Sequence, residues 1–168
     1  MRLIPKKYGS SIFQEILFVC RFKKILSLTR DIKDSKLCIT KIDKEILRFN
    51  QTKHHFLAKR CIELIILKGV TLIGFGEYED GIDTLKTIYV EYLEEYNMIV
   101  PYYNNLLYAL TLSNKLNDAK IIYTKLNAYM KKNELIIDKP LKDTIATYEF
   151  YTGNLNKSRL LFEEINSD

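Results

Sequence analysis

Glycine and proline are scarce in this chain of 168 residues, which contains six glycines and three prolines. Folds built from short β-strands need many tight turns, so a chain this poor in turn-forming residues is expected to be helical. Hydrophobic residues make up 47% of the sequence and charged residues 28%, which are globular proportions and exclude a wholly disordered chain. The length suits one domain, so we treat residues 1–168 as a single domain.

Cysteine and histidine are too few, and too poorly spaced, to build a disulfide framework or a metal site. Cys20, Cys38 and Cys61 are odd in number and form no C-x-x-C pair, which suits a reducing compartment. His54 and His55 are adjacent, so on a helix they would point about 100° apart and could not chelate one metal ion. The sequence therefore predicts neither a bound metal nor a cofactor.

Signatures of membrane insertion and of catalysis are also missing. The longest apolar runs fall far below the roughly 20 residues that span a bilayer, and Gln14 and Glu15 interrupt the apolar stretch that a secretory signal would need. No nucleophile elbow is present. No phosphate-binding loop is present either, because the candidate Gly74-Phe75-Gly76 lacks the later glycine of a dinucleotide site. We therefore expect a non-enzymatic protein of the cytoplasm, or a membrane-associated one if an anchor lies outside this sequence.

Basic side chains are concentrated in the first third of the chain. Residues 1–60 hold 15 Lys/Arg against 5 Asp/Glu, a net charge of +10, whereas residues 61–168 have a net charge of −5. Such a segment can bind an anionic membrane surface or nucleic acid in a salt-sensitive way, or it can be a solvated surface without a partner. No recognition helix or RNA-binding strand motif accompanies it, so sequence-specific reading of nucleic acid is not expected. The basic patch comprises Lys6, Lys7, Arg21, Lys23, Lys24 and Arg30.

Apolar residues recur at helical spacing through most of the chain. Ser11-x-x-Gln14 forms a capping box that predicts a helix through residue 28, and residues 36–49 are expected to be helical because a lone strand would have no partner. Asp138 and Pro140 are expected to be the N-cap and first turn of a later helix. The other helices are predicted from about 52 to 73, from 82 to about 96, from 101 to 113, from 119 to 130, from 140 to 152 and from 155 to 165.

Three turns of the chain share one pattern: Gly76–Gly81, Asn114–Ala119 and Gly153–Ser158. In each turn, an apolar residue lies two positions after the first residue, and a small residue lies five positions after the first residue. A large apolar residue lies four positions after the small one. The small residues are 38 and 39 positions apart. Small side chains at a fixed phase let the two helices of a pair approach closely, so we expect consecutive helix pairs that cover one another.

This turn pattern resembles the tetratricopeptide repeat, a unit of two helices joined by a turn. The family prefers a small residue seven positions before the turn, where this chain has Gly69, Leu107 and Ala146, so two of the three positions match. The spacing here is four or five residues longer, and the proline that ends the family's repeat is missing. The resemblance covers about residues 56–168 as three repeats and implies an all-α fold, a short right-handed solenoid of αα-hairpins with about eight helices. Residues 1–55 either add a degenerate repeat or lie outside the solenoid.

In this family the first helix of each pair lines a concave groove, so the resemblance implies a non-catalytic scaffold that binds a protein or peptide partner. The twelve tyrosines either contribute to such a groove or replace Phe and Leu in the core. The basic residues that would clamp a peptide's terminal carboxylate are missing. The outer face of the last helix is expected to contact a second copy of the chain. The implied partner-binding residues are Asn104, Tyr108, Thr111, Asp143, Thr147 and Tyr151.

Overall fold

The computed structural model describes residues 20, 21, 23–25, 27, 35–50 and 55–167. These residues form α-helices joined by short connections, with no strand among them, which confirms the predicted all-α fold. The helices beyond residue 34 are α2 (Ser35–Asn50), α3 (His55–Gly74), α4 (Tyr78–Lys86), α5 (Val90–Glu95), α6 (Ile99–Leu112), α7 (Leu116–Lys132), α8 (Lys139–Tyr151) and α9 (Leu155–Ser167).

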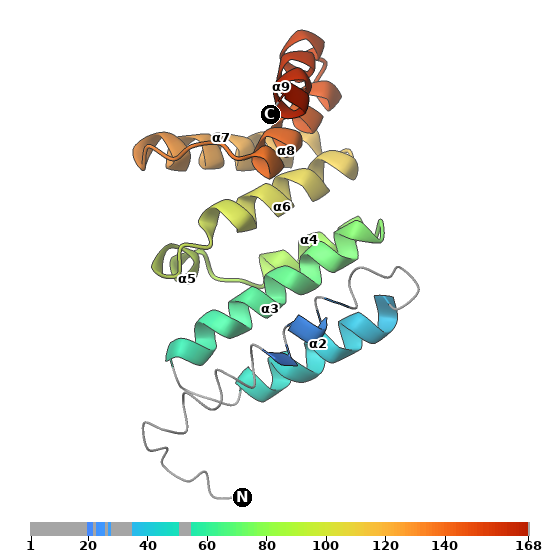
Figure 1. The fold of residues 1–168 in the computed structure, drawn as a ribbon, viewed down its shortest axis with the longest axis vertical. Coiled ribbons are helices and arrows are strands. Elements are labelled where there is room, and N and C mark those ends of the chain that lie inside the picture. The colour runs from blue at the N-terminus through green and yellow to red at the C-terminus, as the bar shows by residue number, and fades with distance from the viewer. Residues whose placement is uncertain (1–19, 22, 26, 28–34, 51–54, 168) are drawn as a thin grey trace, which may run out of the picture.

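The helices follow one another along the long axis of the molecule, from α2 toward one end to α9 at the other (Figure 1). Within each of the pairs α3–α4, α6–α7 and α8–α9, the two helices are joined by a short turn and pack against each other. Helix α6 connects neighbouring pairs because it packs against both α4 and α8. Helix α2 packs against α3, and the short helix α5 leads from the first pair into the second.

The three turns that share a sequence pattern also share one backbone geometry. Gly76, Asn114 and Gly153 have φ values of 80°, 59° and 86°. In each turn the N–H of this residue donates to the carbonyl three positions earlier, and the next N–H donates to the carbonyl five positions before it. This arrangement ends a helix with a left-handed residue and satisfies two carbonyls that would otherwise be free. Gly76 and Gly153 therefore end α3 and α8 close to the predicted helix ends at residues 73 and 152.

Small residues lie where the two helices of a pair cross. Gly81, Ala119 and Ser158 are all buried, as expected from their phase in the pattern. A Cβ on Gly81 would lie 2.7 Å from Ile73 Cγ1 and 3.1 Å from the carbonyl oxygen of Gly69. Helices α3 and α4 therefore approach too closely to leave room for a side chain at this position.

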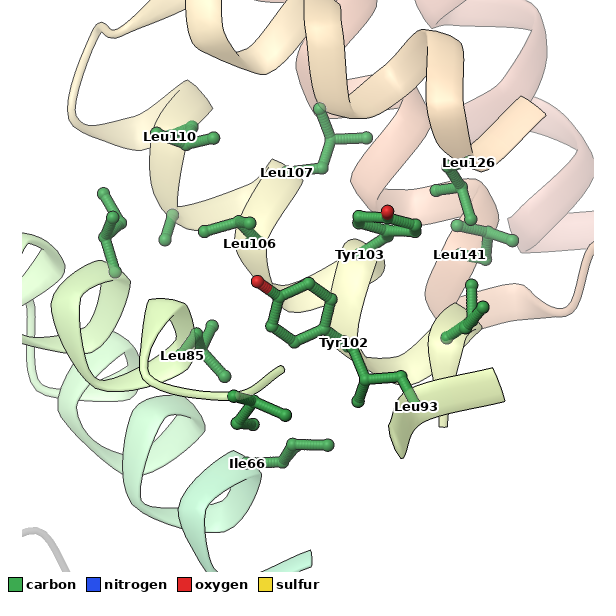
Figure 2. Close-up of a cluster of buried hydrophobic side chains, with 14 of the residues drawn as sticks. Ile66, Leu85, Leu93, Tyr102, Tyr103, Leu106, Leu107, Leu110, Leu126 and Leu141 are labelled. Carbon is green, nitrogen blue, oxygen red and sulfur yellow. The ribbon is translucent and has the colours of Figure 1, made fainter. Parts of the chain in front are cut away.

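The largest group of buried side chains surrounds α6 (Figure 2). Tyr102 points toward the side of α6 on which Leu85 of α4 lies, whereas Tyr103 points toward Leu126 of α7 and Leu141 of α8. All five side chains are at most 8% exposed. Helix α6 is therefore buried on two sides, which fixes its position between the helix pairs.

Part of the tyrosine content belongs to this core. Tyr96, Tyr102, Tyr103 and Tyr148 are between 5% and 8% exposed. Burial raises the pKa of all four hydroxyls, with smaller contributions from neighbouring charges. The alternative in which tyrosine replaces Phe and Leu in the core therefore holds for these four residues.

The second predicted helix is interrupted. Helix α4 ends at Lys86 and α5 begins at Val90, with Tyr89 between them in an extended conformation (φ −73°, ψ 128°). β-Branched residues, which are poor helix formers, cluster at this point of the sequence. Ile88 and Leu93 are both buried, whereas Tyr89 and Tyr92, which continue the helical spacing of apolar residues in the sequence, are 72% and 49% exposed. The prediction of one continuous helix was wrong for this reason.

Candidate functional site

Five of the six expected partner-binding residues lie on partly or fully exposed positions of α6 and α8. Asn104 and Tyr108 are four residues apart on α6, and Asp143, Thr147 and Tyr151 follow one another at the same spacing on α8. Residues four apart share one side of a helix, and the two helices pack against each other. We call these five residues the α6–α8 face.

Helix α8 is positioned by its first turn and by its buried side. The Asp138 carboxylate accepts a hydrogen bond from the backbone N–H of Leu141 at 3.1 Å, and Pro140 lies in the first turn, as predicted. Leu141 and Ile145 are buried against the rest of the core. With the start and the inner side of α8 fixed in this way, Asp143, two residues after Leu141, is left exposed.

Tyr108 links the two helices electrostatically. Burial raises the pKa of its hydroxyl, and the charges of Asp143, Tyr78 and Tyr151 raise this pKa further. The structure therefore brings Tyr108 of α6 within electrostatic range of Asp143 and Tyr151 of α8. Of these groups, the Asp143 carboxylate carries a negative charge at neutral pH, and this charge attracts a cation at the surface.

Two acceptor groups of the α6–α8 face have no partner in the described part of the chain. The Oδ1 atom of Asn104 is buried and accepts no hydrogen bond, which costs the protein some stability. The Asp143 carboxylate is exposed and makes no ion pair or hydrogen bond with any described residue. Asp143 is directly accessible to a ligand, whereas Asn104 can present its oxygen only by rotating its side chain.

Thr111, the sixth expected residue, does not belong to this surface. Its side chain is fully buried, and its hydroxyl donates to the carbonyl of Leu107 at 2.8 Å. Helix α6 packs against α3, α4 and α8, so the side of α6 that carries Thr111 is covered. The expectation that Thr111 contacts a partner does not fit this burial, because helical spacing alone does not tell which side of a central helix stays open.

Aromatic exposure increases toward the end of α8. Phe150 and Tyr151 are 57% and 42% exposed, and their rings form an edge-to-face pair with centroids 5.9 Å apart. The positions that correspond to Phe150 in the two preceding helix pairs, Thr111 and Ile73, are buried. The end of α8 therefore exposes an aromatic side chain at a repeat position that is buried in the two preceding helix pairs.

A cleft of about 910 Å³ lies between α7, the end of α8 and the first turn of α9. The Glu149 side chain in its wall is only 3% exposed. The Glu149 carboxylate accepts hydrogen bonds from Lys157 at 2.5 Å, from Asn154 at 2.6 Å and from the Tyr123 hydroxyl at 3.0 Å. The Lys157 ammonium also lies 5.5 Å from the centroid of the Tyr123 ring, a cation–π geometry. This network joins three helices.

Glu149 acts as a structural anchor rather than as a general base. Burial alone would raise its pKa, but the hydrogen bonds from Lys157, Asn154 and Tyr123 outweigh burial and lower this pKa. The carboxylate is therefore ionised at neutral pH, and its three donors occupy it. Sequence reasoning did not single it out, although a signal was present: Glu149 is a lone acid four positions after Ile145, on the buried side of its helix.

The basic patch is described only in part. Arg21 donates to Glu45 of α2 at 3.3 Å, so its charge is engaged within the protein. Lys23 and Lys24 are exposed. The members of the patch that lie outside the described residues are Lys6, Lys7 and Arg30.

The described residues contain neither a cluster of metal ligands nor a helix suited to cross a membrane. No group of three or more His, Cys, Asp or Glu side chains gathers in these ranges. Cys38 and Cys61 are buried, and burial raises the pKa of both thiols, which keeps them protonated at neutral pH. No helix in the same ranges is both long and apolar enough to span a bilayer.

Comparisons with protein-family models, with curated proteins and with solved structures give no match for this chain. Its function is therefore inferred from its own residues and their geometry.

Proposed function

We propose that this protein is a non-catalytic scaffold that holds an extended peptide segment of a partner protein on its α6–α8 face. The observation that carries the proposal is that Tyr108 of α6 and Asp143 and Tyr151 of α8, all partly or fully exposed, lie on two helices that pack against each other. We place this activity in the cytoplasm because the cysteines are free thiols.

In this proposal the helix pairs form a short right-handed solenoid similar to tetratricopeptide repeats. The three turns with the same backbone hydrogen bonds, spaced by 38 and 39 residues, support a repeating unit. The buried small residues Gly81, Ala119 and Ser158 support the same crossing in each pair. Repeats of this kind stack with a small rotation between neighbours and so create one extended binding surface.

The chemistry of the α6–α8 face suits a peptide. Tyrosine offers a large and rigid contact area with a polar end, and it loses little conformational freedom on binding. Tyr108 and Tyr151 provide such anchors, and Asn104 and Thr147 lie beside them with polar side chains. A few aromatic anchors usually supply most of the binding energy of a protein interface.

A random-peptide selection tests the proposal. The wild-type protein is immobilised and exposed to a phage-displayed library of random dodecapeptides. We expect enrichment of a related set of peptides, and loss of their binding in the double variant Tyr108→Ala/Tyr151→Ala, because that variant lacks both anchors. Absence of any enriched set, or undiminished binding by the double variant, would contradict the proposal.

The chain offers a matched control on α5. Tyr89 and Tyr92 are 72% and 49% exposed and also form an edge-to-face pair, with centroids 6.3 Å apart. The double variant Tyr89→Ala/Tyr92→Ala removes two exposed rings without changing α6 or α8, so it should bind the selected peptides as the wild type does. Both double variants should keep the helical circular dichroism of the wild type.

The expected contact between two copies of the chain belongs to the outer side of α9. Leu155 and Leu160 of this helix are 59% and 54% exposed. Light scattering at increasing protein concentration measures the association directly, and a mass that stays monomeric would reject it.

A second candidate function is salt-sensitive adhesion of the basic first third of the chain to an anionic surface. The exposed side chains of Lys23 and Lys24 favour it. Sedimentation with vesicles that contain phosphatidylserine should be strong at low salt and should disappear as salt is added, because screening weakens surface electrostatics. Binding that persists at high salt would argue for another mechanism.

A further inference from the structure

We infer that the α6–α8 face selects a partner segment that carries a positively charged side chain, Lys or Arg, which packs against Tyr108, Asp143 and Tyr151. This inference rests on the proposed function and adds the chemical class of the bound segment.

The same chain already holds one lysine in this way. The Lys157 ammonium lies 2.5 Å from Oε1 of Glu149, 3.0 Å from the Tyr123 hydroxyl and 5.5 Å from the centroid of the Tyr123 ring. A carboxylate of α8 and a tyrosine of a neighbouring helix therefore bind an ammonium group in this fold. On the α6–α8 face, α8 also carries an exposed carboxylate, Asp143, which makes no ion pair or hydrogen bond with a described residue, and the packed helix α6 carries Tyr108 within range of its charge.

The lysines nearest to Asp143 in the sequence do not occupy this position. Lys142 makes an ion pair with Glu164 of α9 at 3.1 Å. Lys139 lies one helical turn before Asp143 and makes no ion pair with it in the structure. The Asp143 carboxylate is therefore open to a cation that arrives from outside.

The local field has the sign that attracts such a cation. Burial is the largest cause of the raised pKa of Tyr108, and the Asp143 carboxylate adds to it. The negative potential that disfavours a phenolate here stabilises an ammonium or guanidinium group.

The neighbouring aromatic side chains suit the rest of a Lys or Arg residue. Lys and Arg carry a long apolar stem beneath the charged group, and this stem packs well on aromatic surface. Phe150 and Tyr151 expose such a surface two turns along α8 from Asp143. An acidic segment would meet the Asp143 carboxylate with a charge of the same sign and would bind less well.

The dodecapeptides enriched by the wild-type protein provide the test. We expect most of them to share a Lys or Arg residue, and exchange of this residue for neutral norleucine or citrulline should weaken binding about tenfold. The variant Asp143→Asn should weaken binding of the unchanged peptide to a similar degree. Because both changes remove the same interaction, their combination should cost little more than either one alone. Fluorescence anisotropy at physiological salt measures all four affinities.

Asp118→Asn is the matched control. It removes one negative charge from the first turn of α7 and leaves the α6–α8 face intact, so the affinity should stay within about twofold of the wild type. Enriched peptides that depend on Tyr108 and Tyr151 but share no cationic residue would overturn the inference and leave the proposed function standing. Unchanged affinity after exchange of the cationic residue for norleucine or citrulline would also overturn the inference and leave the proposed function standing. If the wild type enriches no peptides, the proposed function fails and the inference fails with it.

Discussion

The absence of a side chain at Gly81 sets how closely α3 and α4 pack. A Cβ there would meet Ile73 at 2.7 Å and the Gly69 carbonyl at 3.1 Å, and a backbone carbonyl cannot move aside cheaply. We expect Gly81→Ala to lower the free energy of unfolding by about 1–3 kcal/mol, as overpacked cores do. Urea denaturation followed by circular dichroism measures this change.

Gly74→Ala is the control for this prediction. An added Cβ on Gly74 would find no atom within 4 Å, so the substitution should change stability by less than about 1 kcal/mol, in the stabilising direction that helix propensity favours. Equal effects of Gly81→Ala and Gly74→Ala would show that close helix contact at Gly81 does not matter.

Glu149 is the residue at which a single charge matters most for stability. The Glu149 carboxylate accepts hydrogen bonds from Lys157, Asn154 and Tyr123. Glu149→Gln replaces one of its oxygens with an NH2 group, which is a donor and would face these donors. We expect a loss of about 2 kcal/mol in urea denaturation, the usual range for hydrogen bonds to a charged group. Glu164→Gln breaks an exposed pair with Lys142 and should cost about 0.5 kcal/mol or less. A smaller loss at Glu149 than at Glu164 would contradict the anchor role.

At the scale of helices and turns, the predictable features are those that depend on adjacent residues. Gly76 and Gly153 end helices because glycine takes a left-handed conformation easily, and Asp138 begins one because its side chain caps the first turn. The break before α5 was not predictable in this way. Ile88 in the connection and Leu93 of α5 both reach the core, and the exposed Tyr89 and Tyr92 continue the apolar pattern between them, so the sequence does not reveal the bend.

Asn114 tests how much the shared turn geometry contributes. It has the same left-handed backbone as its glycine counterparts, with φ 59°. Asn114→Val should lower the free energy of unfolding by about 1–2 kcal/mol, since a β-branched residue is strained there, whereas Asn114→Gly should be tolerated. Asn117→Val is the control: Asn117 is exposed in the first turn of α7, and Val and Asn have similar helix propensities. Equal stability of the two valine variants in thermal unfolding would contradict this role of the turn.

At the scale of the whole molecule, the sequence did not predict which polar side chains are buried. The carboxylate of Glu149 is stabilised by donors from two other segments, and Thr111 is covered because α6 packs on several helices. The cover over Thr111 and the Tyr123 donor of Glu149, 26 residues before it, depend on contacts between residues that are far apart in the chain. The all-α fold followed from local spacing, because helical periodicity is a local property, whereas Tyr108 and Tyr151 were singled out by the resemblance to tetratricopeptide repeats.

Buried ionisable groups also set the pH range of the whole molecule. The lowered pKa of Glu149 stabilises the fold above about pH 4.3, and this contribution is lost as the pH falls through the folded pKa. The raised pKa values of Tyr102 and Tyr103 stabilise it below about pH 10, and their contribution is lost as the pH rises further. The raised pKa values of the buried Cys38 and Cys61 thiols add stability below about pH 8.5 that is lost as the pH rises further. We therefore expect the melting temperature to be constant between about pH 4.3 and pH 8.5 and to fall on both sides. Unchanged melting well above pH 10 would show that these tyrosines are not buried.

Binding of a partner segment on the α6–α8 face is tested most directly by heteronuclear NMR of the isotope-labelled protein, titrated with a dodecapeptide that the wild type has selected. We expect the largest backbone shifts in α6 and α8 around Tyr108, Thr147 and Tyr151. The largest shifts in α7 and α9 around Tyr123 and Lys157, or in α2, would contradict this assignment and move the binding site elsewhere.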